Sequence, residues 1–157
     1  MLEIERKFLI SRPNEDLLSG YKYSEIRQTY LLPKGRVRKR EYDNKTVYTH
    51  TVKTSVTNIT RIENEREITR SEYEELLKIA DPSRKTITKR RYIVPYRGFS
   101  FELDDFGAEY MHALLEIELP SEDKEFCLPE FINVVREVTD EHEYKNSSIA
   151  AKGFPDK

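Results

Sequence analysis

The segment LEIERKFLI, residues 2–10, decides which fold we expect for this chain. Its charged and apolar residues alternate, and an alternation with a period of two is typical of a β-strand. Successive side chains of a strand point to opposite faces, so Glu3, Glu5 and Lys7 share one face while Ile4 belongs to the other. One such strand also fits an ordinary sheet with its charged face in water. The rest of the chain must therefore decide where this charged face lies.

The same alternation recurs along most of the chain, and helical periodicity is confined to short stretches. The clearest helix is expected over residues 72–80, with Ser71 as its N-cap. Weaker helical candidates are residues 14–19, residues 129–134 and a C-terminal turn within residues 146–153. Strands are expected over residues 2–10, 26–32, 36–42, 47–54, 61–69, 87–94, 99–106, 113–119 and 134–139.

The charged faces of these strands are sorted by sign. Like charges at neighbouring positions of one face repel each other in water unless a ligand of opposite charge lies between them. Paired arginines and lysines therefore indicate a polyanion, and paired carboxylates indicate hard cations. The charges that share a face within their strands are Arg36, Arg38 and Arg40; Lys53; Arg61, Glu63 and Glu65; Lys89 and Arg91; Glu102 and Asp104; and Glu116 and Glu118.

A closed antiparallel barrel with charges inside and apolar residues outside accounts for this pattern. About eight strands leave an interior that is just wide enough for side chains or one small ligand. An isolated ion in a dry interior costs on the order of 20 kcal/mol, so the interior must be wet and its charges paired. We therefore expect an α+β fold that is mainly antiparallel β: a closed eight-stranded β-barrel, or tunnel, with a charged lumen and a few helices packed outside. Residues 1–157 are expected to form one domain.

Composition excludes several classes of function. The chain has 27 basic and 29 acidic residues, a net charge of -2, which argues against a partner such as duplex nucleic acid. A single cysteine, Cys127, and the lack of an apolar leader or membrane span indicate a reducing, cytoplasmic location and no membrane partner. His50, His112 and His142 lack metal-ligand spacing and are interpreted as surface or structurally satisfied histidines.

The ordered series of motifs resembles the CYTH domain, the family of triphosphate tunnel metalloenzymes. The N-terminal strand is similar to the family's E-x-E-x-K signature, and the resemblance covers nearly the whole chain. One departure is the long interval between Arg38 and Lys53, within which Arg40 repeats the arginine spacing. The further matching segments are residues 27–31 (R-Q-x-Y-L), 36–38 (R-x-R), 51–53 (T-x-K), 61–68 (R-x-E-x-E-x-x-I), 89–91 (K-x-R), 102–104 (E-x-D), 115–119 (L-x-E-x-E) and the closing stretch 137–155.

The resemblance implies a tunnel that binds a small-molecule triphosphate together with Mg²⁺ or Mn²⁺, with the C-terminal turn plugging one mouth. It implies Glu5, Lys7 and Glu118 as catalytic residues. Substrate binding would fall to Lys7, Arg36, Arg38, Lys53, Lys89 and Arg91. Metal binding would fall to Glu3, Glu5, Glu116 and Glu118, with Glu63, Glu65 and Asp104 as candidates for a second metal or for orienting water. The residues do not decide the oligomeric state, and a homodimer is one of the possibilities.

Three functions are compatible with these residues. The leading hypothesis is metal-dependent hydrolysis of inorganic triphosphate or of a related organic or nucleoside triphosphate. The second is an adenylate cyclase, in which a ribose hydroxyl replaces water as the nucleophile. The third is a module that binds polyphosphate or nucleotide without turnover. The retained carboxylate pairs argue against the third, because a pure anion receptor would gain affinity by losing them.

Overall fold

The computed structural model describes residues 2–155. It contains three short α-helices, α1 (Glu15–Leu18), α2 (Arg70–Leu76) and α3 (Asn146–Lys152), and two 3-10 turns, η1 (Leu77–Ile79) and η2 (His142–Tyr144). The strands are β1 (Leu2–Ser11), β2 (Tyr23–Tyr30), β3 (Arg36–Tyr42), β4 (Lys45–Ser55), β5 (Thr60–Ile68), β6 (Ile87–Tyr96), β7 (Phe99–Asp105), β8 (His112–Glu118) and β9 (Val134–Glu137).

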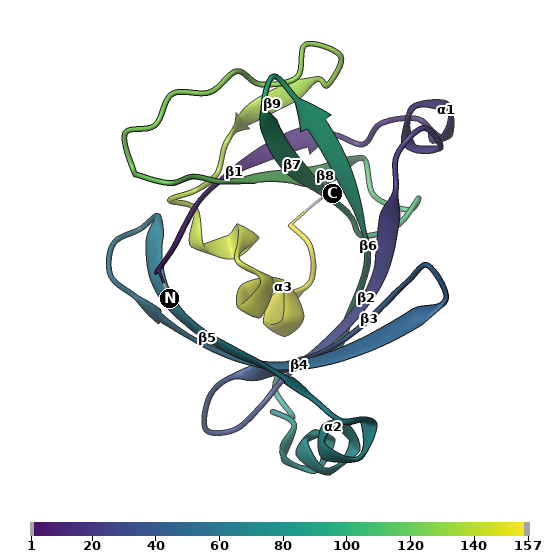
Figure 1. Ribbon diagram of the computed structural model, residues 1–157, viewed down its shortest axis with the longest axis vertical. Helices are drawn as coiled ribbons and strands as arrows, with labels where there is room; N and C mark the ends of the chain where they lie inside the picture. The colour runs from purple at the N-terminus through teal and green to yellow at the C-terminus, as the bar shows by residue number, and fades with distance from the viewer. Residues whose placement is uncertain (1, 156–157) are drawn as a thin grey trace.

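Eight of these strands form a closed antiparallel barrel (Figure 1), which confirms the expected fold. The sheet order is β5-β4-β3-β2-β6-β7-β8-β1-β9, and a pairing between β5 and β1 closes the ring. Strand β1 pairs with β8 along one edge. Along its other edge, residues 2–4 pair with β5 and residues 8–10 pair with the short β9. The N-terminal strand therefore holds the closure of the barrel together.

The apolar faces of the strands lie outside the barrel, where helices and loops cover them. Phe8, Phe101 and Leu115 are buried in a cluster that α1 covers with Leu18 and that Ile132 of a long loop also joins. A second outer cluster is formed where α2 packs on β3 and β4, and Ile68 at the end of β5 joins it. Burial of such side chains contributes about 1.5–3 kcal/mol each. The reversed polarity expected from the sequence is therefore present.

The helix boundaries differ from the expectation at two places. Helix α2 is capped by Thr69 and not by Ser71: the Thr69 hydroxyl accepts from the backbone N–H of Glu72, whose carboxylate accepts from the backbone N–H of Thr69. This reciprocal capping box satisfies two amides at the helix start. Residues 129–134 form no helix and lead into β9.

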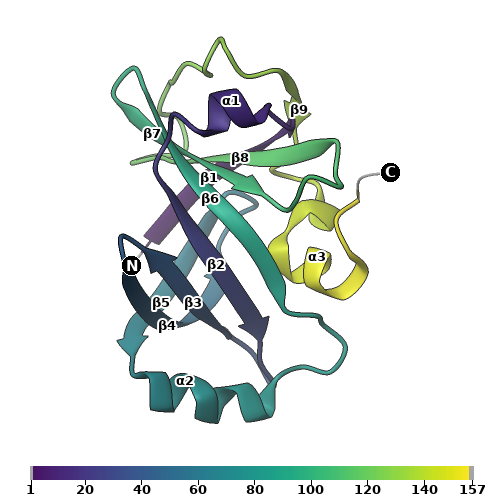
Figure 2. The same cartoon turned by 90° about the vertical axis from the view of Figure 1, so that its right-hand side faces the viewer.

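Helix α3 lies at one mouth of the barrel and not outside it (Figures 1 and 2). The reason is visible in β1, whose lumen face is charged up to Lys7 and then continues with the buried Leu9. Leu9 pairs with Leu114 of β8, and both pack against Ile149 of α3 and the adjacent Phe154. One end of the lumen is thus apolar and provides a seat for the C-terminal segment, residues 142–154. The expected plug is confirmed, while the expectation that the helices pack outside holds for α1 and α2.

Candidate functional site

The register of the strands brings charged side chains together across the lumen. Lys7 of β1 lies opposite Glu116 of β8, and Glu5 lies opposite Glu118. Lys53 of β4 lies opposite Glu63 of β5. Because paired residues of neighbouring strands point to the same face, these side chains converge on one enclosed space. The charged lumen expected from the sequence is confirmed.

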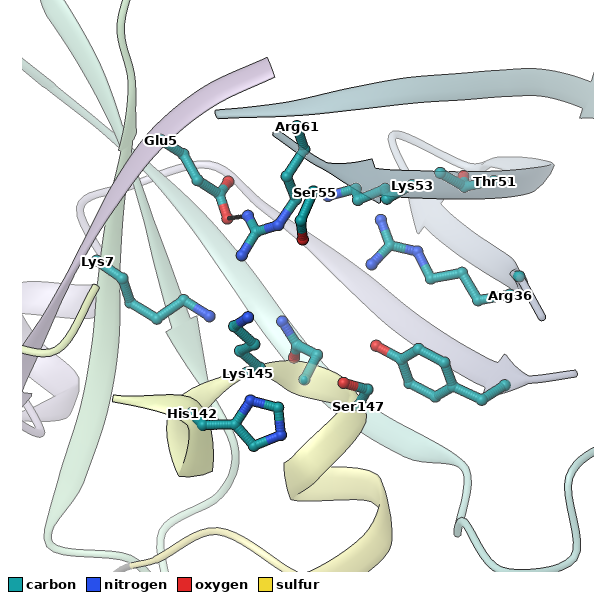
Figure 3. Close-up of a pocket in the computed structure, with 13 residues that line it drawn as sticks. Glu5, Lys7, Arg36, Thr51, Lys53, Ser55, Arg61, His142, Lys145 and Ser147 are labelled. Carbon is teal, nitrogen blue, oxygen red and sulfur yellow. Dashed lines mark hydrogen bonds and ion pairs between the residues drawn. The ribbon is translucent and has the colours of Figure 1, made fainter. Parts of the chain in front are cut away.

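A cavity of about 300 Å³ lies between the barrel wall and the C-terminal segment (Figure 3). Its walls come from the five strands β1 to β5 on one side and from residues 142–147 on the other. Five cationic side chains and one carboxylate line it, so the cavity attracts anions. The charged groups are Lys7, Arg36, Lys53, Arg61, Lys145 and Glu5.

Three of the cavity cations already have carboxylate partners. The Lys53 ammonium lies 2.8 Å from Glu3 and 3.6 Å from Glu63. The Lys7 ammonium lies 3.3 Å from Glu116 and donates to the backbone carbonyl of residue 144 at 3.0 Å. Arg61 donates to Glu5 at 3.2 Å. These pairs hold the cations in place at the cavity wall.

The other two cavity cations lack such partners. The buried Nε of Arg36 has no hydrogen-bond partner among residues 2–155. Within the same range, the Lys145 ammonium makes no hydrogen bond or ion pair, and Figure 3 shows it extending from the C-terminal segment into the cavity. A buried donor without an acceptor costs about 1–3 kcal/mol. Both groups are therefore ready to bind an anionic ligand.

Carboxylates cluster at the side of the cavity near Lys53. Burial, together with hydrogen bonding to Glu3, raises the pKa of Glu63 to about 7. Burial and the charge of Glu3 also raise the pKa of Glu118. Burial would raise the pKa of Glu3 as well, but hydrogen bonding with Glu63 and the charge of Lys53 outweigh it and lower that pKa. The crowding of these acidic groups is unfavourable, and a divalent cation would relieve it.

The donor chemistry of this cluster fits a hard divalent cation. Its oxygens belong to carboxylates, the ligands that Mg²⁺ and Mn²⁺ prefer. Across residues 2–155, however, no three acidic, histidine or cysteine side chains already form a metal cage. Glu3 is engaged with Lys53 and Glu5 with Arg61. A metal would therefore compete with these two cations for the carboxylates.

A second group of charges is buried deeper in the lumen. Lys89 and Arg91 share the carboxylate of Asp104 at 2.7 Å each, and the Lys89 and Asp104 side chains are fully buried. Burial lowers the pKa of Lys89 to about 7, although Asp104 opposes this effect. Burial would raise the pKa of Asp104, but the charges of Arg91 and Lys89 hold it well below its usual range. Lys89 also donates to the Oδ1 of Asn146 in α3 at 3.1 Å.

The structure separates the residues singled out in the sequence into three groups. The cavity wall contains four of them: Glu5, Lys7, Arg36 and Lys53. Glu3, Glu63 and Glu118 form the carboxylate cluster beside the cavity, and Glu65 accepts from the Thr51 hydroxyl at 2.8 Å. Arg38, Lys89, Arg91, Asp104 and Glu116 do not line the cavity and belong to the deeper network, where Arg38 donates to Gln28.

The cavity is also lined by residues for which no role was expected from the sequence. Arg61 shares a strand face with Glu63 and Glu65. This shared face could have identified Arg61 as a residue that points into the lumen. Lys145 lies in a segment without clear periodicity; the family resemblance places the C-terminal turn at one mouth of the tunnel but gives Lys145 itself no role. His142 is exposed, as expected for a surface histidine, yet it lies at the cavity wall. None of the helices in residues 2–155 is long and apolar enough to cross a membrane.

Comparison with known proteins agrees with this architecture. A curated inorganic triphosphatase from Acetivibrio thermocellus is 36% identical over 156 residues, which is 97% of this chain and 95% of that protein. The crystal structure of the inorganic triphosphatase NE1496 matches with a TM-score of 0.58 and 30% identity, over 95% of this chain and 94% of the other. Protein PH1819 from Pyrococcus horikoshii OT3 shares the fold, with a TM-score of 0.55 and 20% identity over 78% of this chain and 80% of that one. The family model of the CYTH domain matches residues 1–153, and the chain therefore belongs to the CYTH domain family.

Proposed function

We propose that this protein is a metal-dependent triphosphatase that binds its substrate in the lumen, and that the whole chain acts as one domain. The observation that carries the proposal is the cavity, in which five cations face one carboxylate. A linear triphosphate carries about four or five negative charges at neutral pH, and charge-assisted hydrogen bonds from lysine and arginine can neutralise them. The names of the two triphosphatase relatives support the same activity.

The cations on the cavity wall would hold the phosphates from opposite sides. Lys7, Arg36 and Lys53 extend from the barrel, and Lys145 extends from the C-terminal segment (Figure 3). Phosphoryl transfer depends mainly on positioning and on stabilising the charge that spreads over the phosphate oxygens. A substrate held by both walls would be fixed in orientation and shielded from bulk water. Arg38, Lys89 and Arg91 lie deeper in the lumen than the cavity. They would add to the positive electrostatic potential at the phosphates.

The carboxylates beside the cavity would hold Mg²⁺ or Mn²⁺. Glu3, Glu63 and Glu118 provide a shared set of oxygens, and Glu5, which lies opposite Glu118 in register, would join them as a metal ligand. Glu116 is the next carboxylate toward the lumen. Such an ion, when bound, neutralises phosphate charge and lowers the pKa of a water molecule. Lys53, which lies between Glu3 and Glu63, would keep the carboxylate cluster next to the substrate.

Product analysis tests this proposal. The protein would be incubated with Mg²⁺ or Mn²⁺ and, in separate reactions, with inorganic triphosphate, thiamine triphosphate and ATP, while free phosphate and cyclic AMP are measured. We expect metal-dependent release of phosphate. Formation of cyclic AMP without free phosphate would instead identify a cyclase. Tight triphosphate binding without any product would identify a binding module.

A further inference from the structure

Arg61 occupies a special position in the wall of the cavity. It lies near the start of β5, where that strand closes the barrel, and pairs in register with Glu3 of β1 and with Ser55 of β4. Its side chain is 15% exposed and lines the cavity. Figure 3 shows its guanidinium beside Glu5. Lys145 of the C-terminal segment lies across the cavity from both groups (Figure 3).

The guanidinium uses little of its hydrogen-bonding capacity. Within residues 2–155, its one hydrogen bond or ion pair is the contact from NH1 to Glu5 Oε1 at 3.2 Å. An arginine carries several N–H donors in a planar fork, and most of those of Arg61 remain without an acceptor. A half-buried guanidinium with spare donors beside an anion-attracting cavity can donate to a second partner there, a bound anion.

Glu5 cannot serve Arg61 and a divalent cation equally well. Arg61 holds the Glu5 carboxylate by an ion pair, whereas the proposed function requires this carboxylate near the metal. A bound cation would draw the carboxylate oxygens away and would also repel the guanidinium. The fork of an arginine binds a phosphate with the same two-pronged geometry as a carboxylate. A phosphate in the cavity can therefore replace Glu5 as the partner of Arg61.

We propose that Arg61 is a substrate-binding residue that exchanges Glu5 for a phosphate group of the substrate when the metal binds Glu5. The inference rests on the proposed function and adds a coupling between the two ligands. In the unliganded protein, Arg61 competes with the metal for Glu5. In the loaded protein, Arg61 neutralises the phosphate instead, so the metal and the triphosphate favour each other through this residue.

The variant Arg61→Gln tests the exchange through two binding measurements. Mn²⁺ binding without triphosphate would be measured by electron paramagnetic resonance, and triphosphate binding in the presence of Mn²⁺ by calorimetry. We expect Arg61→Gln to bind Mn²⁺ more tightly than wild type, because the competitor for Glu5 is gone. We expect it to bind triphosphate about 10- to 100-fold more weakly, since hydrogen bonds between charged groups are lost. Arg66→Gln, on the exposed side of the same strand, is the matched control and should change neither affinity.

The opposite results would overturn the inference. Weaker Mn²⁺ binding in Arg61→Gln would mean that Arg61 only holds Glu5 in position for the metal. Unchanged triphosphate affinity would mean that Arg61 never contacts the substrate. Arg61→Lys keeps the charge and loses the fork, so it replaces the glutamine variant if that variant does not fold, and it should also weaken triphosphate binding. Wild-type protein that binds Mn²⁺ but neither binds nor hydrolyses triphosphate would overturn the proposed function itself, which separates the two failures.

Discussion

Replacement of Asp104 by asparagine would show how strongly the lumen depends on its balanced charges. The Asp104 carboxylate is the shared partner of two buried cations, Lys89 at 2.7 Å and Arg91 at 2.7 and 2.9 Å. Asparagine has nearly the same shape but no charge, so Asp104→Asn leaves two buried cations without their main counterion. Glu102, at 3.4 Å from Arg91, and Glu116, at 3.6 Å, compensate only in part.

The expected loss of unfolding free energy is about 3–5 kcal/mol, the range found when one partner of a buried ion pair is removed. For a chain of this length, that corresponds to a fall in melting temperature of roughly 6–20 °C. Urea denaturation followed by circular dichroism and tyrosine fluorescence would measure the loss. The control is Glu74→Gln, which breaks an exposed pair with Arg70 and should cost at most about 0.5 kcal/mol. If both variants lost the same small amount, Asp104 would not be holding a buried charge network.

Four further results are expected. Lys53→Met and Lys145→Met should each raise the KM for triphosphate about tenfold or more, because each removes a cation from the cavity wall, and steady-state kinetics would measure this. Glu118→Gln should abolish metal-dependent turnover while the protein stays folded, and retained activity would remove Glu118 from the metal site. Chelation by EDTA should stop phosphate release, and added Mg²⁺ or Mn²⁺ should restore it. Hydrogen bonding from Arg6 lowers the pKa of Glu137, so this pair stabilises the fold above the unfolded pKa of about 4.3 and its contribution disappears as the pH falls through the folded pKa. Glu137→Gln should therefore cost about 0.5 kcal/mol at pH 7 and nothing in strong acid, as measured by urea denaturation across pH.

The barrel could be predicted because the pattern that identifies each strand lies within that strand's own sequence. Alternation with a period of two marks each strand, and the segment of residues 36–42 was expected with the bounds that β3 has. The cap of α2 could not be predicted in the same way, since Thr69 and Ser71 are both good caps. The choice depends on where β5 ends, at Ile68, and the end of a strand is set by its partner.

The charged lumen could be predicted from the same periodicity. Which of its charged residues line the cavity and which belong to the deeper network could not. Which cations face the cavity depends on where the C-terminal segment docks, and this docking depends on apolar contacts of Leu9 and Leu114 that join distant parts of the chain. Lys89 is consequently buried against Asp104 and Asn146, while Lys145 lines the cavity. The roles of Lys89 and Arg91 in substrate binding stay predictions.

A crystal structure with triphosphate and Mn²⁺ bound tests the central claim most directly, because it locates the phosphates and the metal together. We predict phosphate oxygens inside the lumen, within hydrogen-bonding distance of Lys7, Arg36 and Lys53. The anomalous signal of Mn²⁺ should lie among the carboxylates of Glu3, Glu5 and Glu118. Triphosphate bound to the outer surface, with these lysines still paired only to protein carboxylates, would contradict the account.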